Sequence, residues 1–364
     1  MSDYEETPWL TDPGPVWRHG HPFTGDGGPT TPEAIEGFVN YARFVARHFK
    51  GRVRHYEIWN EENSWAWYGS PPSPQAFGTL IRDTAKAVKE VDPGNKVIIG
   101  GTAALAPVFI AEALEEGGGA YLDGFAFHPY TMPYPEMGLG SLDVIDGKQQ
   151  GKSAAELGYT TYAEMLAFLR TTFAPYNPDF EIWANEWNAI PTSLDSPYRG
   201  GSEITEAKQA ARFFLVNTLH GVKAVWWSLA NQNTVYDWGV LRTDDLSRKP
   251  VYYTIQTLTT LLSGAKPDDS VAAEVVGTPE NLWCKPLRAR DGSLLLALWM
   301  ATPPVDDFET LHLDVTLREV EAGSAEAVDA LHALTQSLVF EAVNGGTVIR
   351  GVTVSDCPIF LRVR

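Results

Sequence analysis

Two short segments of the chain have the same ending, and this repetition constrains the fold more strongly than any other feature of the sequence. Residues 55–61 and 180–186 each run through apolar and aromatic side chains into an asparagine followed by a glutamate. Such residue types favour β-strands, and a stiff strand holds the carboxylate at its last position in a fixed direction. The two segments therefore predict two buried strands that present Glu61 and Glu186 at the mouth of one sheet.

Apolar runs of strand length alternate with amphipathic stretches of helix length over most of the chain. This alternation is typical of a parallel α/β architecture. The predicted strands are 53–59, 96–100, 122–127, 180–185 and 224–228, and the predicted helices are the one that follows Pro32 and those at 74–91, 107–116, 160–174, 204–220 and 250–263. Polar residues collect just after each strand, which is where a (β/α)8 barrel of the TIM type places its active site.

The sequence pattern changes near residue 268. Beyond it, short apolar runs at 293–299, 311–315 and 358–363 are separated by glycine, proline and aspartate turns. This pattern predicts antiparallel strands. We therefore expect an α/β chain with two domains, a (β/α) barrel catalytic domain over 1–267 and a small C-terminal β-sandwich over 268–364.

The charge and composition of the chain exclude several classes of partner. A net charge of −18 over 364 residues repels phosphate backbones, so we expect no nucleic acid partner. No stretch approaches the roughly 20 apolar residues of a membrane span, so we expect no membrane partner. The two cysteines, Cys284 and Cys357, are too few for a disulfide scaffold or a thiolate metal site, and the sequence leaves open whether they pair.

Two carboxylates that face each other at one mouth are the side chains used in glycoside hydrolysis. One serves as general acid/base and the other as nucleophile, and this chemistry needs no metal or organic cofactor. Glu57 and Glu181 lie within strands and are expected to be interior or interface partners rather than catalysts. His19 and His21 resemble the paired histidines of metal-dependent barrel hydrolases, but no strand precedes them, so we expect no metal site. A metal-dependent hydrolase is the weaker alternative, which chelator-sensitive activity would support.

Four segments around these residues together resemble a known group of enzymes. They are Trp59-Asn60-Glu61-Glu62-Asn63 with Trp65 and Trp67 shortly after, Phe127-His128-Pro129-Tyr130, Asn185-Glu186-Trp187-Asn188, and the tail Asp356-Cys357-Pro358-Ile359-Phe360-Leu361. The combination resembles the retaining glycoside hydrolases of clan A. Within the clan, the most similar family is glycoside hydrolase family 39, which includes β-xylosidases and α-L-iduronidases. The resemblance runs from about residue 32 to the C-terminus.

The resemblance implies a role for several residues. By it, Glu61 is the acid/base, Glu186 is the nucleophile, and the substrate is a poly- or oligosaccharide cleaved by double displacement. The candidates for substrate binding flank the strand ends: Asn60, which would bond the sugar 2-hydroxyl, His128, Tyr130, Trp65, Trp187 and Trp227. Trp226 and Trp227 point to opposite faces of their strand, and we assign the sugar platform to Trp227 because it lies nearer the C-terminal end.

The chain departs from the pattern of the clan at two places. Glu62 stands where the clan often has proline, and it either adds a like charge beside Glu61 or points into solvent. The clan places the acid/base at the end of the fourth barrel strand, whereas the 60 residues before Glu61 are too few for three βα units. We therefore expect an N-terminally truncated barrel in which residues 4–10 form at most the end of the third strand.

A truncated barrel would have further consequences. Its open sheet edges would favour a homo-oligomer. It would also allow a second function, that of a catalytically inactive barrel that binds carbohydrate, although the retention of both Asn-Glu pairs favours the hydrolase. We expect a secreted or periplasmic location rather than a cytoplasmic one, although the chain has no signal peptide.

Overall fold

The chain forms two compact units. The computed structural model describes residues 29–63, 73–104, 106–129, 135–136, 161–189, 202–230 and 238–364. Unit 1 comprises Met1–Pro129 and Gly138–Glu186, and unit 2 comprises Tyr130–Met137 and Trp187–Arg364. The chain passes from unit 1 to unit 2 directly after Glu186. The predicted strand end at 4–10 and the histidines His19 and His21 lie outside the described residues.

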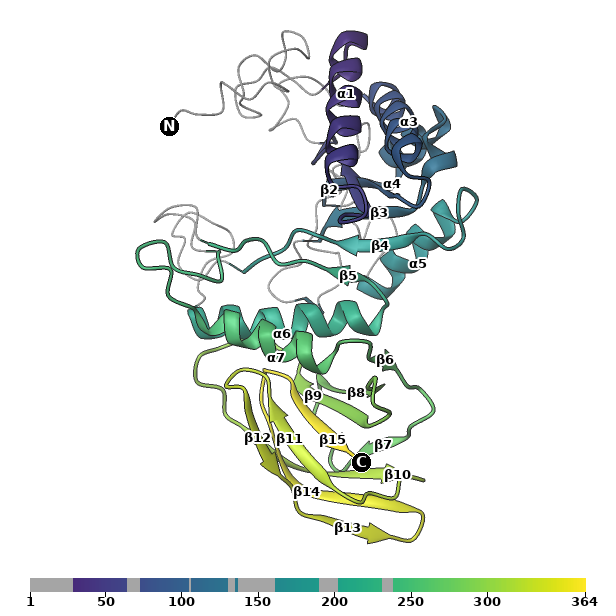
Figure 1. The fold of residues 1–364 in the computed structure, drawn as a ribbon. Coiled ribbons are helices and arrows are strands. Elements are labelled where there is room, and N and C mark those ends of the chain that lie inside the picture. Colours follow the sequence, from purple (N-terminus) through teal and green to yellow (C-terminus); the bar gives the residue numbers. More distant parts are fainter. Residues whose placement is uncertain are drawn as a thin grey trace. The chain divides into compact units, whose positions relative to one another are not determined.

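Unit 1 contains four parallel strands that neighbour one another in the order β1-β2-β3-β4, of which β2, β3 and β4 are labelled in Figure 1. The strands are β1 (His55–Ile58), β2 (Lys96–Ala103), β3 (Gly124–His128) and β4 (Glu181–Ala184), and the helices are α1 (Pro32–His48), α3 (Pro74–Val91), α4 (Pro107–Glu115), η3 (Gly118–Tyr121) and α5 (Tyr162–Phe173). Successive helices contact one another, α1 with α3, α3 with α4 and α4 with α5. The alternation of strand and helix that the sequence predicted is therefore confirmed.

Three helices of unit 1, α1, α3 and α5, begin where the sequence supplies a capping side chain. Thr31 precedes α1 and Ser73 precedes α3, and each hydroxyl accepts a hydrogen bond from the backbone N–H three residues on, at 3.2 Å. Thr161 and Glu164 form a reciprocal capping box at the start of α5. These bonds satisfy donors that the first helical turn leaves unpaired. The helix starts could be predicted because the signals for them are local.

Unit 2 combines two helices with mostly antiparallel strands. Its elements are α6 (Glu203–Leu219), β5 (Lys223–Ala224), α7 (Pro250–Leu261), β6 (Lys266–Pro267), β7 (Ala273–Val275), β8 (Leu282–Arg288), β9 (Leu294–Met300), β10 (Leu311–Arg318), β11 (Ala325–Asp329), β12 (Leu334–Ser337), β13 (Phe340–Val343), β14 (Gly346–Val354) and β15 (Ile359–Val363). One antiparallel sheet has the order β13-β14-β10-β7 and the other has the order β12-β11-β15-β9-β8-β6.

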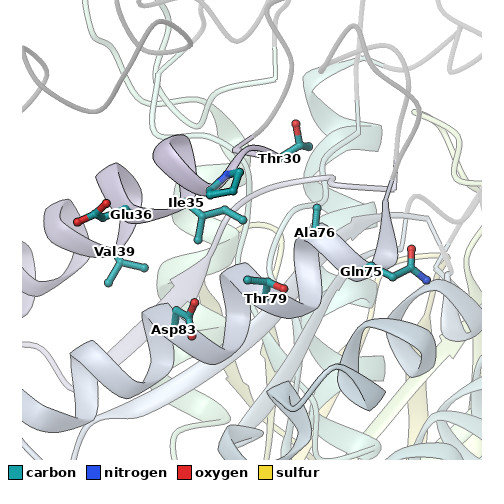
Figure 2. Close-up of a pocket in the computed structure, with 9 residues that line it drawn as sticks. Thr30, Ile35, Glu36, Val39, Gln75, Ala76, Thr79 and Asp83 are labelled. Carbon is teal, nitrogen blue, oxygen red and sulfur yellow. The ribbon is translucent and has the colours of Figure 1, made fainter.

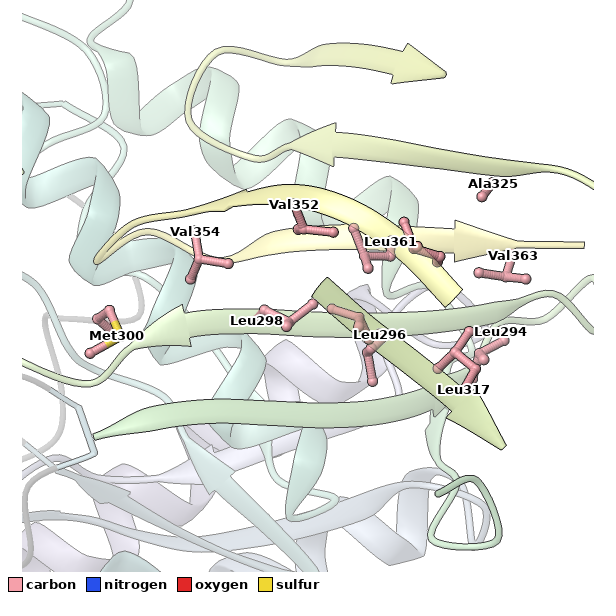
Figure 3. Packing of buried hydrophobic residues seen from close by; sticks show 12 residues of the cluster. Leu294, Leu296, Leu298, Met300, Leu317, Ala325, Val352, Val354, Leu361 and Val363 are labelled. Atoms are coloured by element: carbon pink, nitrogen blue, oxygen red, sulfur yellow. The ribbon is translucent and has the colours of Figure 1, made fainter. Parts of the chain in front are cut away.

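The two antiparallel sheets share one apolar core, part of which is shown in Figure 3. Leu296 and Leu298 of β9 and Leu361 of β15 enter the core from the six-stranded sheet, and all three are fully buried. Leu317 of β10 and Val352 of β14 enter it from the four-stranded sheet. Side chains from two sheets that interdigitate in this way are typical of sheets stacked face to face.

Buried charged groups join α6 to the strands of unit 2. Arg212 donates to both carboxylate oxygens of Glu136, at 2.7 and 2.6 Å, and Trp299 Nε1 donates to the same carboxylate at 2.6 Å. Lys208, one turn earlier on the helix, lies 2.7 Å from the buried carboxylate of Asp356. A desolvated charge is costly without its partner, so these pairs hold α6 in a defined position within unit 2.

The compact units differ from the predicted domains. The antiparallel strands begin with β6, near the predicted boundary at residue 267, but α6 and α7 group with those strands rather than with unit 1. The ion pairs of α6 account for this, because their partners lie far along the chain and leave no local pattern. The predicted strand 224–228 is reduced to β5, so that the tryptophans Trp226 and Trp227 follow the strand.

Both cysteines of unit 2 are free thiols. Burial raises the pKa of the Cys284 thiol to about 11, and Cys357 is buried as well. Thiols with raised pKa are poor nucleophiles at neutral pH, so neither cysteine is a reactive site. Among the helices of the described ranges, none is both long and apolar enough to cross a membrane.

Replacement of Arg212 by leucine should destabilise the protein by about 3–5 kcal/mol, because it leaves the Glu136 carboxylate buried without its cation. The measurement is the free energy of unfolding in urea. Arg318→Leu is the matched control: its pair with Glu274 is exposed, so that variant should stay close to wild type. Equal effects of the two substitutions would contradict the role given to the buried pair.

Candidate active site

Three side chains meet at the carboxyl ends of strands in unit 1. Glu61 lies shortly after β1, His128 is the last residue of β3, and Glu186 lies shortly after β4. His128 Nδ1 is 2.8 Å from Glu61 Oε1 and 3.7 Å from Glu186 Oε2, and one donor atom from each residue lies within 4.8 Å of the other two. His128 and Glu61 are buried, whereas the Glu186 side chain keeps 22% of its surface exposed and can be reached from solvent.

The segment after β1 adopts an uncommon backbone conformation that places Glu61. Trp59 and Glu61 have φ values of 68° and 51°, in the left-handed region that costs side-chain-bearing residues on the order of 1 kcal/mol each. Glu61 N–H donates to the Gly101 carbonyl at 2.8 Å, and the Asn63 carboxamide donates to and accepts from the Ala103 backbone, at 2.9 Å each. These bonds to β2 hold the strained turn in place.

Glu57, within β1, places a third carboxylate near the first two. Asn185 Nδ2 donates to both Glu57 oxygens, each at 2.7 Å. A Cβ at Gly101 would lie 2.5 Å from Glu57 Oε1, so glycine is needed there to leave room. The residue as a whole is exposed, while Asn185 and Gly101 lie against its carboxylate and remove part of its contact with water. This burial raises the pKa of Glu57 to about 7, against the opposing effect of the Asn185 hydrogen bonds.

Glu62 is buried, so the alternative in which it points into solvent is wrong. Within the part of the chain that the structure describes, neither carboxylate oxygen of Glu62 has a hydrogen-bond partner. Burial raises its pKa to about 8, and the charges of Glu57 and Glu61 add to the effect. Glu62 is therefore mostly protonated and neutral at pH 7, and it adds no negative charge beside Glu61 at that pH.

The tryptophans named from the sequence occupy different environments. Trp187 has no exposed surface, because its ring stacks on Phe213 at 4.6 Å and meets Trp226 edge-on at 5.3 Å. This position belongs to the core of unit 2 and offers no open face to a sugar. Trp226 packs against the apolar cluster around Ala207, whereas Trp227 is 39% exposed.

The remaining predicted residues include one exposed side chain and two outside the described ranges. Asn60 is exposed at the strand end, directly before Glu61. Trp65 and Tyr130 lie outside the described residues. Sequence reasoning missed the contact between Glu57 and Asn185, since nothing in the spacing of two distant strands shows which side chains converge.

Glu61, His128 and Glu186 form a set of donor atoms that could surround a metal ion, within the residues searched. Their geometry is that of direct hydrogen bonding, because 2.8 Å between His128 Nδ1 and Glu61 Oε1 is a normal donor–acceptor distance. In this hydrogen bond one proton lies between His128 Nδ1 and Glu61 Oε1. The lone pair that would bind a metal ion is therefore already used by the bond between the two side chains. The arrangement therefore fits acid–base chemistry better than metal binding.

A cavity of about 450 Å³ lies between α1 and α3 (Figure 2). Its lining is largely aliphatic and comprises Thr30, Pro32, Ile35, Glu36, Val39, Gln75, Ala76, Thr79 and Asp83. Neither Glu61 nor Glu186 lines this cavity, and its lining residues come from the two helices and from Thr30 rather than from the strand ends. The candidate site is therefore the strand-end cluster and not this cavity.

Glu62→Gln should change how stability depends on pH. A carboxyl whose pKa rises from 4.5 to about 8 on folding stabilises the protein fully below pH 4.5, and this contribution is lost as the pH rises to about 8. The free energy of unfolding of the variant, relative to that of wild type, should therefore increase by about 1.4 kcal/mol per pH unit within this window. Urea unfolding at pH 5, 6, 7 and 8 measures the difference, and parallel curves for the two proteins would contradict it.

Comparison with known proteins shows a shared fold. No protein-family model matches the sequence, and no curated protein matches it. A similar solved structure is a GH51 arabinofuranosidase from Xanthomonas axonopodis pv. citri, with 14% identity, a TM-score of 0.57 and coverage of 93% of this chain and 74% of that chain. The GH39 enzyme from the same organism has 16% identity, a TM-score of 0.55 and coverage of 91% of this chain and 73% of that chain. The catalytic domain of GH30 xylanase C from Talaromyces cellulolyticus has 14% identity, a TM-score of 0.52 and coverage of 92% of this chain and 70% of that chain. The structural neighbours of the chain are thus clan A glycoside hydrolases, and the resemblance predicted from the sequence is confirmed in the fold.

Proposed function

We propose that this protein is a retaining glycoside hydrolase that cleaves a poly- or oligosaccharide by double displacement. Glu61 is the general acid/base and Glu186 is the nucleophile. The observation that carries the proposal is the separation of the two carboxylates, which have oxygens within 4.8 Å of each other beside His128. Retaining enzymes hold the two carboxyl groups about 5–5.5 Å apart, whereas inverting enzymes hold them about 6.5–9.5 Å apart.

The proposed reaction has two steps. In the first, Glu61 donates a proton to the glycosidic oxygen while the Glu186 carboxylate attacks the anomeric carbon, so that the leaving group departs and a glycosyl ester forms. In the second, the Glu61 carboxylate takes a proton from water, and this water attacks the same carbon and releases Glu186. His128, at 2.8 Å from Glu61, orients the acid/base carboxyl for both steps.

The substrate class and the complete fold are inferred from the neighbours. Among the similar solved structures are a xylanase, a β-xylosidase and arabinofuranosidases, which supports carbohydrate as the substrate. We propose that Asn60 bonds the sugar 2-hydroxyl, and the assignment of Trp65, Tyr130 and Trp227 to the sugar rings stays a prediction from the sequence. The same neighbours support a (β/α)8-type barrel followed by a β-sandwich.

Mechanism-based labelling tests the proposal directly. Activated 2-fluoro glycosides of xylose, arabinofuranose and glucose should leave a covalent sugar on Glu186, which peptide mapping by mass spectrometry locates. The fluorine slows hydrolysis of the ester, so the intermediate accumulates. Glu186→Gln should take up no label, and a chelator should leave labelling of wild type unchanged. Folded wild-type protein that no sugar labels would contradict the hydrolase and favour a barrel that binds carbohydrate without turnover.

Glu61→Gln should separate the two catalytic roles. Cleavage of an oligosaccharide, whose leaving group needs a proton, should fall by about 10²- to 10⁴-fold. Labelling by a 2-fluoro glycoside with a dinitrophenolate leaving group should persist, because this anion departs without protonation. Glu181→Gln, at the far end of β4, serves as the control that keeps both activities. A variant that loses both reactions equally would show that Glu61 is not the acid/base.

A further inference from the structure

Glu57 is an ionisable group near the site that the two-carboxylate reaction does not use. It lies within β1, four residues before Glu61, which follows the end of that strand. Its carboxylate takes two hydrogen bonds from a single amide group, Asn185 Nδ2. Asn185 is bonded directly to the proposed nucleophile Glu186. The contact therefore links the strand of the acid/base to the strand of the nucleophile.

The contact between Glu57 and Asn185 spans the sheet. Strands β1 and β4 are separated by β2 and β3, and three strand spacings on a flat sheet amount to about 14 Å. A glutamate and an asparagine side chain, together with a 2.7 Å hydrogen bond, are too short to bridge that distance. The sheet must therefore curve towards the face that carries Glu57, and the contact depends on that curvature.

The charge state of Glu57 decides how it can hold Asn185. As a carboxylate it accepts from Asn185 Nδ2 with both of its oxygens, as observed. As a carboxylic acid it keeps one oxygen that can accept and gains an O–H to donate, and Asn185 Oδ1, which is buried and has no hydrogen-bond partner among the described residues, is an acceptor within reach of this proton. To accept this proton the amide has to turn over. Ionised and neutral Glu57 thus favour two different orientations of the Asn185 side chain.

Several charged groups face Glu57. From β3, His128 favours the ionised form, and from β4, Glu186 opposes it. From the segment after β1, the carboxyl of Glu62 interacts with Glu57, while β2 presents Gly101, which has no side chain. Together with burial, these neighbours bring the pKa of Glu57 to about 7, so both charge states are populated near neutrality.

We propose that Glu57 is a positioning residue: its carboxylate fixes the orientation of the Asn185 amide and thereby the direction of Glu186, and it releases this hold when it is protonated. The inference rests on the proposed function, because Glu186 needs a fixed direction only if it attacks a substrate carbon. A nucleophile misdirected by a fraction of an ångström loses much of the benefit of a preorganised site.

The positioning contact itself can be tested without any substrate. In the full-length protein labelled with ¹⁵N, the side-chain amide signals of Asn185, assigned by their loss in Asn185→Asp, should shift with pH about a midpoint near 7. Glu57→Gln should abolish this titration. Glu181→Gln makes the same chemical change at the far end of β4, the strand that leads to Asn185, and should leave the titration in place. Asn185 signals that do not move between pH 6 and 8, or that still titrate in Glu57→Gln, would overturn the proposal.

The catalytic consequence can be tested with the 2-fluoro dinitrophenyl glycoside that labels Glu186. In wild type the maximal rate constant of labelling should rise with pH through about 7, as Glu57 ionises. In Glu57→Gln it should be about 10- to 100-fold lower and lack this rise, with the half-saturating glycoside concentration unchanged. A rate constant and pH profile in Glu57→Gln equal to those of wild type would overturn the positioning role. Absence of labelling in wild type would instead contradict the proposed function, and the amide titration would still decide whether Glu57 holds Asn185.

Discussion

Removal of water from a cluster of neighbouring carboxyl groups is the constraint on which the site in unit 1 depends. Glu57, Glu61, Glu62 and Glu186 gather at one end of the parallel strands, and His128 lies among them. Four negative charges in a partly desolvated space would be costly, because the interaction between like charges grows as water is excluded. Loss of water around these carboxyls, with repulsion as the smaller cause, raises the pKa of Glu62 to about 8 and that of Glu57 to about 7, so that at pH 7 a proton neutralises most of Glu62 and part of Glu57.

Curvature of the parallel sheet brings these groups together. The contact of Glu57 with Asn185 joins strands that are not neighbours. Two hydrogen bonds between the Asn63 side chain and the backbone of Ala103 in β2 hold the segment that follows β1. Gly101 contributes twice, through a carbonyl that accepts from Glu61 N–H and through a missing Cβ that leaves space for Glu57. Backbone strain at Glu61 is thus offset by interactions with one adjacent strand.

Unit 2 is stabilised by an apolar core together with buried ion pairs. Its two antiparallel sheets share an apolar core, while helix α6 carries buried cations whose partners lie elsewhere in the unit. Arg212 and Lys208 both face acids that are almost completely buried. Such pairs add specificity rather than large net stability, because desolvation offsets much of their attraction. They explain why α6 belongs with the antiparallel strands although its sequence resembles that of a barrel helix.

The sequence by itself determined the local elements and the places of Glu61 and Glu186 just after two strands. Capping residues such as Thr31 and Ser73 and the alternation of apolar runs act within a few residues, so the helices, most strands and the strand-end positions of Glu61 and Glu186 could be predicted. Tertiary structure decided what depends on distant partners: the burial of Glu62, the core position of Trp187, the grouping of α6 and the contact of Glu57 with Asn185. Burial and the pKa of a carboxyl are properties of surroundings assembled from several strands, and no local pattern in one strand specifies them.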